Sequence, residues 1–201
     1  MESNDTSDPS FWNDRYLARE TGWDKGRTAP PIERMLREGL VVNGASMLVL
    51  CAGRGHDAIS AARQGYRVAA VDFAEQAAEA IRSASRQSGL EVEVVEADVL
   101  GLPSTHPGRF DAALEHLAFC ALPPERRQDY ARMLHAVLRR GGVYFGLFFA
   151  HGRPGGPPFT TSEEELREIF SPLFDIARLV PARDSFPSRA GEELEFVFRR
   201  R

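Results

Sequence analysis

A pair of glycines and two acidic residues are the groups in this sequence whose types and spacing suit nucleoside binding. Gly53 and Gly55 follow a continuous apolar run at 47–50, where the absent side chains let the backbone turn sharply and approach a ligand. Asp72 stands where a carboxylate can accept hydrogen bonds from both ribose hydroxyls of an adenosine. Asp98 follows the third expected strand, at 91–96, where a carboxylate can reach the exocyclic amine of adenine. Together these residues predict a nucleoside-binding crevice.

Alternating strand and helix patterns predict the scaffold that positions these residues. The order indicates an α/β, Rossmann-like fold, with a seven-stranded, mostly parallel sheet, a C-terminal antiparallel hairpin and helices on both faces. Parallel strands end at one edge of a sheet, so the glycine loop and both aspartates should converge there. We expect a single domain over 1–201, with an N-terminal arm at 1–40 and a Rossmann-like core at 46–201. The expected strands are 47–50, 67–71, 91–96, 110–114, 143–149, 174–180 and 192–198, and the expected helices 32–36, 58–64, 74–88, 125–139 and 161–170.

Composition excludes several classes of protein. The 201 residues are 43% hydrophobic and 27% charged, which is typical of one soluble globular domain. A net charge of −4 argues against a nucleic-acid partner, and no apolar run approaches the roughly 20 residues of a membrane span. The first ten residues lack the features of a secretion signal, so a cytoplasmic location is expected. Cys51 and Cys120 are too few for a disulfide framework or a structural zinc site, and no metal is expected.

Two cofactors fit the glycine loop. Gly53, Gly55 and Ala58 satisfy the G-x-G-x-x-G/A pattern of dinucleotide-binding proteins, so a NAD(P)-dependent oxidoreductase is one alternative. The chain is too short for a separate substrate domain, and Asp57 at the helix start would repel a pyrophosphate. S-adenosylmethionine carries no phosphate, so the sequence favours it.

Four motifs in order resemble the class I S-adenosylmethionine-dependent methyltransferases, specifically the thiopurine and thiol (halide) methyltransferase group. The resemblance extends from Phe11 to about Phe174. Its glycine loop departs from the group's V-P-G-C-G-x-G-x-D pattern at Leu50, Cys51 and Ala52. The four motifs are FWNDRY at 11–16 with TGWDKG at 21–26 and prolines at 30–31, VLCAGRGHD at 49–57, FCALPPERR at 119–127 and GGPPF at 155–159.

The resemblance implies a cofactor site for S-adenosylmethionine and its product S-adenosylhomocysteine. In this group the N-terminal segment covers the cofactor, and an aromatic face near a sulfonium gains about 0.5–2 kcal/mol. The alternative to a cofactor contact is that both tryptophans only anchor the N-terminal arm to the core. The implied cofactor-binding residues are Trp12, Trp23, Gly53, Gly55, Asp72, Phe73, Asp98, Val99 and Glu115.

The resemblance also implies an acceptor site after the fourth strand, with Tyr16, His116, Phe119 and Phe159 contacting the acceptor. Plant-type members have an acidic residue and a tyrosine where this chain has Glu115 and His116, which weakens a halide-specific interpretation. His116 is open to three interpretations: a general base, a hydrogen-bond donor to the acceptor, or a rim residue without a role. Phe159 is either a wall of the acceptor site or ordinary core packing.

Arg127 is the second candidate catalytic residue, because it matches the arginine of the group's P-P-x-x-R stretch. It would steer an anionic acceptor, although an exposed helix charge explains it nearly as well. The expected reaction is methyl transfer to a small thiol or thio-heterocycle. N- or O-methylation of a small heterocycle and a non-catalytic S-adenosylmethionine-binding module are the alternatives. We expect a monomer or a weak homodimer with no nucleic-acid or membrane partner.

Overall fold

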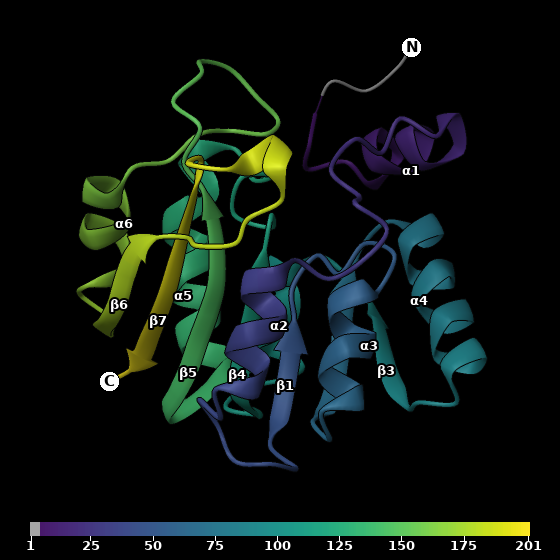
Figure 1. The fold of residues 1–201 in the computed structure, drawn as a ribbon, viewed down its shortest axis with the longest axis horizontal. Coiled ribbons are helices and arrows are strands. Elements are labelled where there is room, and N and C mark those ends of the chain that lie inside the picture. Colours follow the sequence, from purple (N-terminus) through teal and green to yellow (C-terminus); the bar gives the residue numbers. More distant parts are fainter. Residues whose placement is uncertain (1–4) are drawn as a thin grey trace.

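The computed structural model describes residues 5–201, which form one mixed sheet of seven strands in the order β3-β2-β1-β4-β5-β7-β6 (Figure 1). Strands β1 to β5 run parallel, and β7 runs antiparallel to both β5 and β6. The predicted Rossmann-like sheet with its C-terminal antiparallel pair is therefore confirmed. The strands are β1 (Ser46–Val49), β2 (Arg67–Asp72), β3 (Val92–Glu96), β4 (Phe110–His116), β5 (Leu138–Phe149), β6 (Phe174–Pro181) and β7 (Glu193–Arg200).

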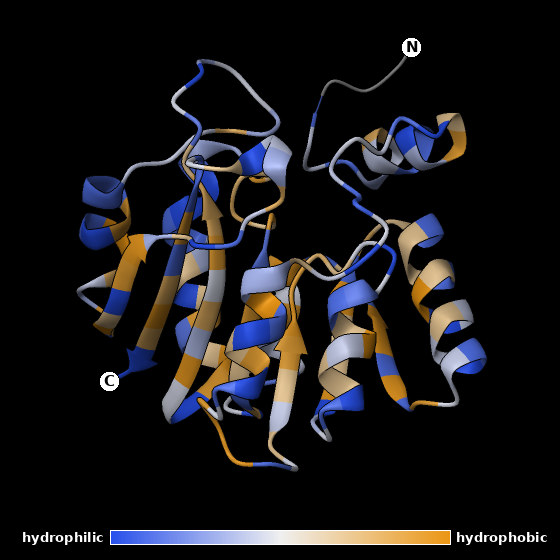
Figure 2. Ribbon diagram, viewed as in Figure 1, coloured by the Kyte–Doolittle hydropathy of each residue, from blue (hydrophilic) through white to orange (hydrophobic). Residues whose placement is uncertain are grey.

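Helices cover both faces of the sheet because successive strand residues point to opposite sides. In β1, Met47 and Val49 pack toward α2 (Pro30–Arg37) and α3 (His56–Arg63), whereas Leu48 packs toward α5 (Arg127–Val137). Buried apolar residues of the central strands belong to the core on both sides of the sheet, which is typical of a sheet covered by helices. Figure 2 shows hydrophobic colours along most of β1. The remaining helices are α4 (Glu75–Ser88) on the α3 side, α6 (Glu163–Phe170) on the α5 side, and the 3₁₀ turns η1 (Val99–Ser104), η2 (Pro124–Arg126) and η3 (Pro187–Arg189).

Strand β5 begins earlier than the sequence pattern indicates. Leu138 pairs with Phe110, and a register shift in β4 then restores pairing from Ala112 to Val143. The strand therefore includes Gly141 and Gly142, and helix α5 ends at Val137, two residues before the expected end at 139.

The N-terminal arm contains a helix that the sequence pattern did not indicate. Helix α1 (Pro9–Ala18) begins after Asp8, whose side chain accepts a hydrogen bond from the Ser10 N–H. Phe11 is buried, and the helix packs against α4. In Figure 1, α1 lies at the same end of the sheet as the loop after β5 and the segment between β6 and β7. The first four residues of the expected arm lie outside the described residues.

Candidate active site

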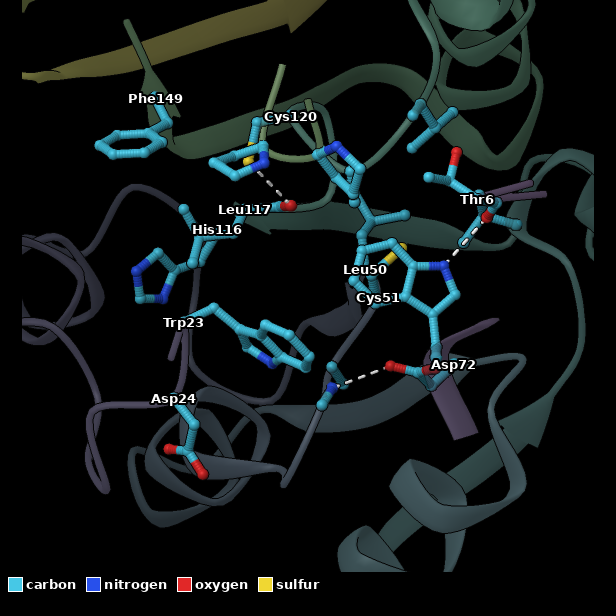
Figure 3. A pocket seen from close by; sticks show the side chains of 18 of the residues that line it. Thr6, Trp23, Asp24, Leu50, Cys51, Asp72, His116, Leu117, Cys120 and Phe149 are labelled. Carbon is cyan, nitrogen blue, oxygen red and sulfur yellow. Dashed lines mark hydrogen bonds between the residues drawn. The ribbon is translucent and has the colours of Figure 1, made fainter. Parts of the chain in front are cut away.

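One cavity of about 520 Å³ lies at the carboxyl ends of β1, β2 and β4. Its walls come from segments far apart in the sequence: the arm, the turn after β1, the residues after β2 and β3, the end of β4 with the segment that follows it, the loop after β5, and the segment before β7. Figure 3 shows Trp23 in this cavity with His116 and Asp72 around it. The parallel sheet therefore brings the predicted segments together at its carboxyl edge.

The turn after β1 adopts backbone conformations that only glycine takes without strain. Gly53 and Gly55 have φ values of 55° and 82°. A Cβ on Gly53 would lie 3.3 Å from the Tyr16 hydroxyl, whereas a Cβ on Gly55 would lie 3.3 Å from Ile81 of α4. Gly53 lines the cavity, but Gly55 packs against α4 outside it. The structure thus gives Gly55 a supporting role in place of the expected direct contact.

Asp72 lies at the end of β2 with its carboxylate fixed by backbone donors. Gly53 and Ala74 each donate an N–H to one of its oxygens at 3.0 Å. Figure 3 marks one hydrogen bond to the Asp72 carboxylate with a dashed line. Burial raises the pKa of Asp72, while these N–H donors oppose that rise. Each carboxylate oxygen retains a further lone pair, so Asp72 can accept hydrogen bonds from a vicinal diol.

The residues after β2 and β3 complete this part of the cavity. Asp98 accepts the Leu100 N–H at 2.9 Å and so starts η1, and its side chain is exposed. Phe73 and Val99 line the cavity beside the two aspartates. The four residues predicted at the ends of these two strands, Asp72, Phe73, Asp98 and Val99, therefore all line the same cavity.

Three aromatic residues of the arm form an edge-to-face cluster over the cavity. The ring of Trp23 lies 5.5 Å from Trp12 and 5.7 Å from Tyr16, at interplanar angles of 79° and 88°. Burial, followed by the nearby charge of Asp72, raises the pKa of Tyr16 well above its usual value. Tyr16 is consequently a neutral hydroxyl, and the cluster presents largely apolar faces to the cavity.

The arm is fastened to the core at two points beside this cluster. Asp24 forms an ion pair with Arg54 of the turn after β1 at 2.8 Å and accepts a hydrogen bond from His56 of α3 at 3.1 Å. On the other side, the backbone carbonyl of Trp23 accepts a hydrogen bond from Arg189 at 2.6 Å. These contacts hold the aromatic cluster against the glycine turn.

His116, at the end of β4, lies in a chain of polar contacts. Its Nδ1 is 2.7 Å from Asp57 and its Nε2 is 3.2 Å from Arg189, which in turn lies 3.5 Å from Glu193. Burial lowers the pKa of His116, but the charge and hydrogen bond of Asp57 outweigh it, so the pKa lies above its usual value. Burial raises the pKa of Asp57, but His116 outweighs this and lowers it. Arg189 is a site residue that sequence reasoning missed, since no local pattern marks it.

Glu115, expected to bind the cofactor, lies outside the cavity. It is fully buried, and it accepts hydrogen bonds from Tyr130 at 2.5 Å, Tyr144 at 3.0 Å and the Phe119 N–H at 2.9 Å. Burial raises the pKa of Glu115. The carboxylate therefore joins α5 and β5 to the end of β4. Glu115 was expected to contact the cofactor, but the structure places it in the core, where it holds these elements together.

Arg127, expected to steer the acceptor, is also buried away from the cavity. Its guanidinium donates to Glu165 at 2.6 Å and to the Thr160 carbonyl at 3.0 Å, and it lies 4.6 Å from the centre of the Phe119 ring. The neighbouring Arg126 lines the cavity in its place. Arg127 therefore fixes the segment before α6. It was expected to act in catalysis by steering the acceptor, but its position in the structure is a structural one.

Two expected acceptor contacts are likewise displaced. Phe119 is buried among core rings, 5.1 Å from the ring of Phe148. Phe159 does not line the cavity, whereas Pro157 and Pro158 before it do. The apolar wall near His116 consists instead of Leu117, Cys120, Ala121, Leu122, Pro123 and Phe149.

Both cysteines face the cavity as protonated thiols. Burial raises the pKa of Cys120 to about 12 and that of Cys51 well above its usual value. A thiol without thiolate character is a small apolar group and not a nucleophile. Among residues 5–201, no three His, Cys, Asp or Glu side chains converge as metal ligands would. None of the helices in this range has both the length and the apolar composition to cross a membrane.

The strand order, the glycine turn after β1 and the carboxylate after β2 define a class: this is a Rossmann-like, S-adenosylmethionine-dependent methyltransferase. The 1,6-didemethyltoxoflavin-N1-methyltransferase of Burkholderia thailandensis, solved with S-adenosylhomocysteine, is similar in structure, with a TM-score of 0.78 and 26% identity over 96% of this chain and 86% of that one. The chain belongs to the thiopurine S-methyltransferase family, whose model matches residues 7–199.

Proteins of this family are similar in sequence over most of their length. "Probable thiol methyltransferase 2" of Arabidopsis thaliana is 28% identical over 90% of this chain and 81% of its own. The thiopurine S-methyltransferase of Bordetella parapertussis is also 28% identical, over 88% of this chain and 87% of its own. The protein is thus an enzyme that uses S-adenosylmethionine to methylate a small molecule.

Proposed function

We propose that the acceptor atom is the sulfur of a small thiol or thio-substituted heterocycle. The observation that carries this proposal is that Asp72 and the apolar wall around Cys120 belong to one cavity of about 520 Å³. A small, apolar wall suits a polarisable sulfur better than a strongly hydrated oxygen anion. The names of the thiol and thiopurine relatives point to the same acceptor chemistry.

The residues present fit S-adenosylmethionine, which supplies an electrophilic methyl group when bound. We assign the ribose to Asp72, whose oxygens are fixed by Gly53 and Ala74 and keep free lone pairs. Asp98 supplies an exposed carboxylate for the adenine amine. Phe73 and Val99 supply apolar contacts beside it.

The arm serves as a cover in this proposal. Trp12, Tyr16 and Trp23 place aromatic edges and faces over the cavity, where a sulfonium gains electrostatic attraction and water is excluded. We further propose that residues 1–40 and 46–201 act as arm and core of one domain. We also propose a cytoplasmic monomer or weak homodimer with neither nucleic-acid nor membrane partners, consistent with the net charge of −4.

Transfer to a ring nitrogen is the second candidate function. The structurally similar Burkholderia enzyme is named as an N1-methyltransferase, at an identity close to that of the sulfur-methylating relatives. A ring N–H carries a proton that must leave during transfer, and His116 lies in the cavity to take it.

Transfer of a labelled methyl group to a panel of thiols, thiopurines, small nitrogen heterocycles and halides tests the proposal. We expect saturable labelling of at least one sulfur acceptor and weaker labelling of heterocycles that lack sulfur. Labelling only of nitrogen heterocycles, or tight binding of S-adenosylhomocysteine without labelling of any acceptor, would overturn it.

A further inference from the structure

The cavity contains two histidine–aspartate pairs that differ in burial and geometry. In the first, His116 Nδ1 lies 2.7 Å from Asp57, and both side chains are 13% exposed. In the second, His56 Nε2 lies 3.1 Å from Asp24, and the histidine is 36% exposed. The first pair is therefore shielded from water and the second is partly solvated.

The contacts of the first pair identify the protonation state of its histidine. A guanidinium has only N–H donors, so Arg189, at 3.2 Å, must donate to His116 Nε2. Nε2 is then the acceptor nitrogen, and the single ring proton is on Nδ1, where it is donated to Asp57. The structure thus assigns His116 the neutral Nδ1–H tautomer.

Charged groups face His116 from three elements. Asp57 comes from α3, Arg189 from η3 and Glu193 from β7. The Glu193 side chain is fully buried, neither of its oxygens has a hydrogen-bond partner among the described residues, and Arg189 lies 3.5 Å away. Arg189 therefore balances a buried carboxylate already and is not a free cation for an incoming anion.

Arg189 also has contacts that hold it independently of His116. It donates to the Trp23 carbonyl at 2.6 Å and faces Glu193. When another donor takes Nε2, these two partners keep the guanidinium in place. The Nε2 lone pair is consequently a proton-accepting position that the network leaves exchangeable.

We propose that His116 Nε2 takes a proton from the methyl acceptor, with Asp57 as the positioning residue that fixes the tautomer and balances the imidazolium. This rests on the proposed function and narrows its substrate class: the acceptor enters with its proton, as a neutral thiol or the N–H form of a thio-heterocycle. A preformed anion such as a halide does not meet these requirements.

The transfer balances in atoms and charge. The acceptor sulfur forms a bond to the methyl carbon, the bond from that carbon to the sulfonium sulfur breaks, and its electron pair remains on that sulfur. The proton leaves the acceptor, directly or through its conjugated ring, and binds His116 Nε2. The positive charge thus moves from the sulfonium to the imidazolium beside the Asp57 carboxylate.

The first test is the pH dependence of kcat/KM with a thiol acceptor. Asp57 raises the pKa of His116, so activity that needs the neutral ring falls on the acid side, and Asp57→Asn should move this acid limb to lower pH. An adjacent charge shifts a pKa by roughly one unit or more, so we expect a displacement of about one pH unit. Asp24→Asn is the matched control, because it removes the same charge from the other pair and should leave the limb in place.

The second test needs no turnover. Nitrogen-15 shifts of the His116 ring in the cofactor-free protein, assigned with His116→Gln, should show protonated Nδ1 and bare Nε2 above the titration midpoint. Asp57→Asn should lower that midpoint. A bare Nδ1, an unmoved midpoint, or an acid limb that follows the acceptor's own pKa across a thiol series would overturn the inference.

The two tests separate this inference from the proposed function. If no sulfur acceptor is methylated, the proposed function fails, while the ring shifts still decide whether Asp57 sets the tautomer. If sulfur is methylated but Asp57→Asn does not shift the acid limb of kcat/KM, only the inference that His116 accepts the proton fails.

Discussion

We propose that the cavity has a cofactor half and an acceptor half, and the two are built in different ways. In the cofactor half, Gly53, Asp72 and Asp98 follow three successive strands, and backbone N–H groups hold both carboxylates. In the acceptor half, Asp57, His116 and Arg189 come from distant segments and hold one another through side chains. A contact between Arg189 and Trp23, 166 residues apart, joins this half to the arm.

This difference determines how each half responds to substitution. In a site where backbone N–H groups hold the carboxylates, a change of one side chain removes its ligand contact and the bonds to its own backbone donors, and leaves the other carboxylate in place. A site held by side chains loses the geometry of several groups when one is removed. We therefore expect changes in the cofactor half to alter affinity and changes in the acceptor half to alter turnover.

Removing the His116 ring should give the largest effect. We expect His116→Ala to lower kcat/KM about 100- to 10,000-fold, the range for loss of a general base, because the acceptor proton then has no fixed acceptor. The affinity for S-adenosylhomocysteine, measured by calorimetry, should not change.

The same variant discriminates the assisted mechanism from an unassisted one. A thiol forms its thiolate without help above about pH 8. If His116 takes the acceptor proton, the loss in His116→Ala should be large near pH 7 and should shrink above the pKa of the thiol, where the thiolate forms by itself. A loss near pH 7 that is no larger than the loss above pH 8 contradicts proton transfer to His116 and favours a preformed thiolate.

Glu115→Ala should have a large effect on stability and none on the cofactor site. The change leaves the Tyr130 and Tyr144 hydroxyls and the Phe119 N–H buried without an acceptor. At roughly 1–3 kcal/mol for each orphaned group, we expect the free energy of unfolding in urea to fall by about 3 kcal/mol or more. Tyr130→Phe is the milder control. A stable Glu115→Ala protein that no longer binds S-adenosylhomocysteine would restore the role that the sequence suggested.

Asp72→Ala should weaken binding in the cofactor half. Loss of hydrogen bonds to a charged group costs roughly 1.5–3 kcal/mol, which corresponds to a 10- to 150-fold rise in the Kd of S-adenosylhomocysteine by calorimetry. Thermal denaturation provides the control, because Asp72 also holds the Gly53 turn. An unchanged Kd in a folded variant would show that Asp72 does not contact the ribose.

Trp23→Leu should have the smallest effect. The variant keeps an apolar side chain but loses the aromatic face near the sulfonium, which is worth about 0.5–2 kcal/mol. The affinity for S-adenosylmethionine should therefore fall more than that for the uncharged thioether S-adenosylhomocysteine. Equal losses for both would indicate that Trp23 only packs the arm.

Much of the cofactor half could be predicted from the sequence because its signals are local. Glycines after an apolar run and acidic residues after the next two strands specify positions at one sheet edge, and no long-range contact is needed to place them. The arm helix α1 was missed because its apolar residues, at 11, 12, 16, 17 and 18, are spread around the helix and form no single apolar face.

The acceptor half could not be predicted in the same way. Glu115 and His116 are neighbours in β4, so their side chains point to opposite sides, and only His116 reaches the cavity. Arg126 and Arg127 are neighbours at the start of α5, so their side chains point in different directions, and only Arg126 lines the cavity. Arg189 depends on contacts with residues far away in the sequence, for which no local pattern exists.

The most direct test of the central claim uses one acceptor that offers both kinds of atom. A 6-thiopurine presents an exocyclic sulfur and ring nitrogens to the same cavity, so the position of the new methyl group identifies the atom that reacts. Mass spectrometry and NMR of the isolated product should show an S-methyl group, formed at a rate that depends on His116. A product methylated on ring nitrogen, with sulfur unmodified, would contradict the account.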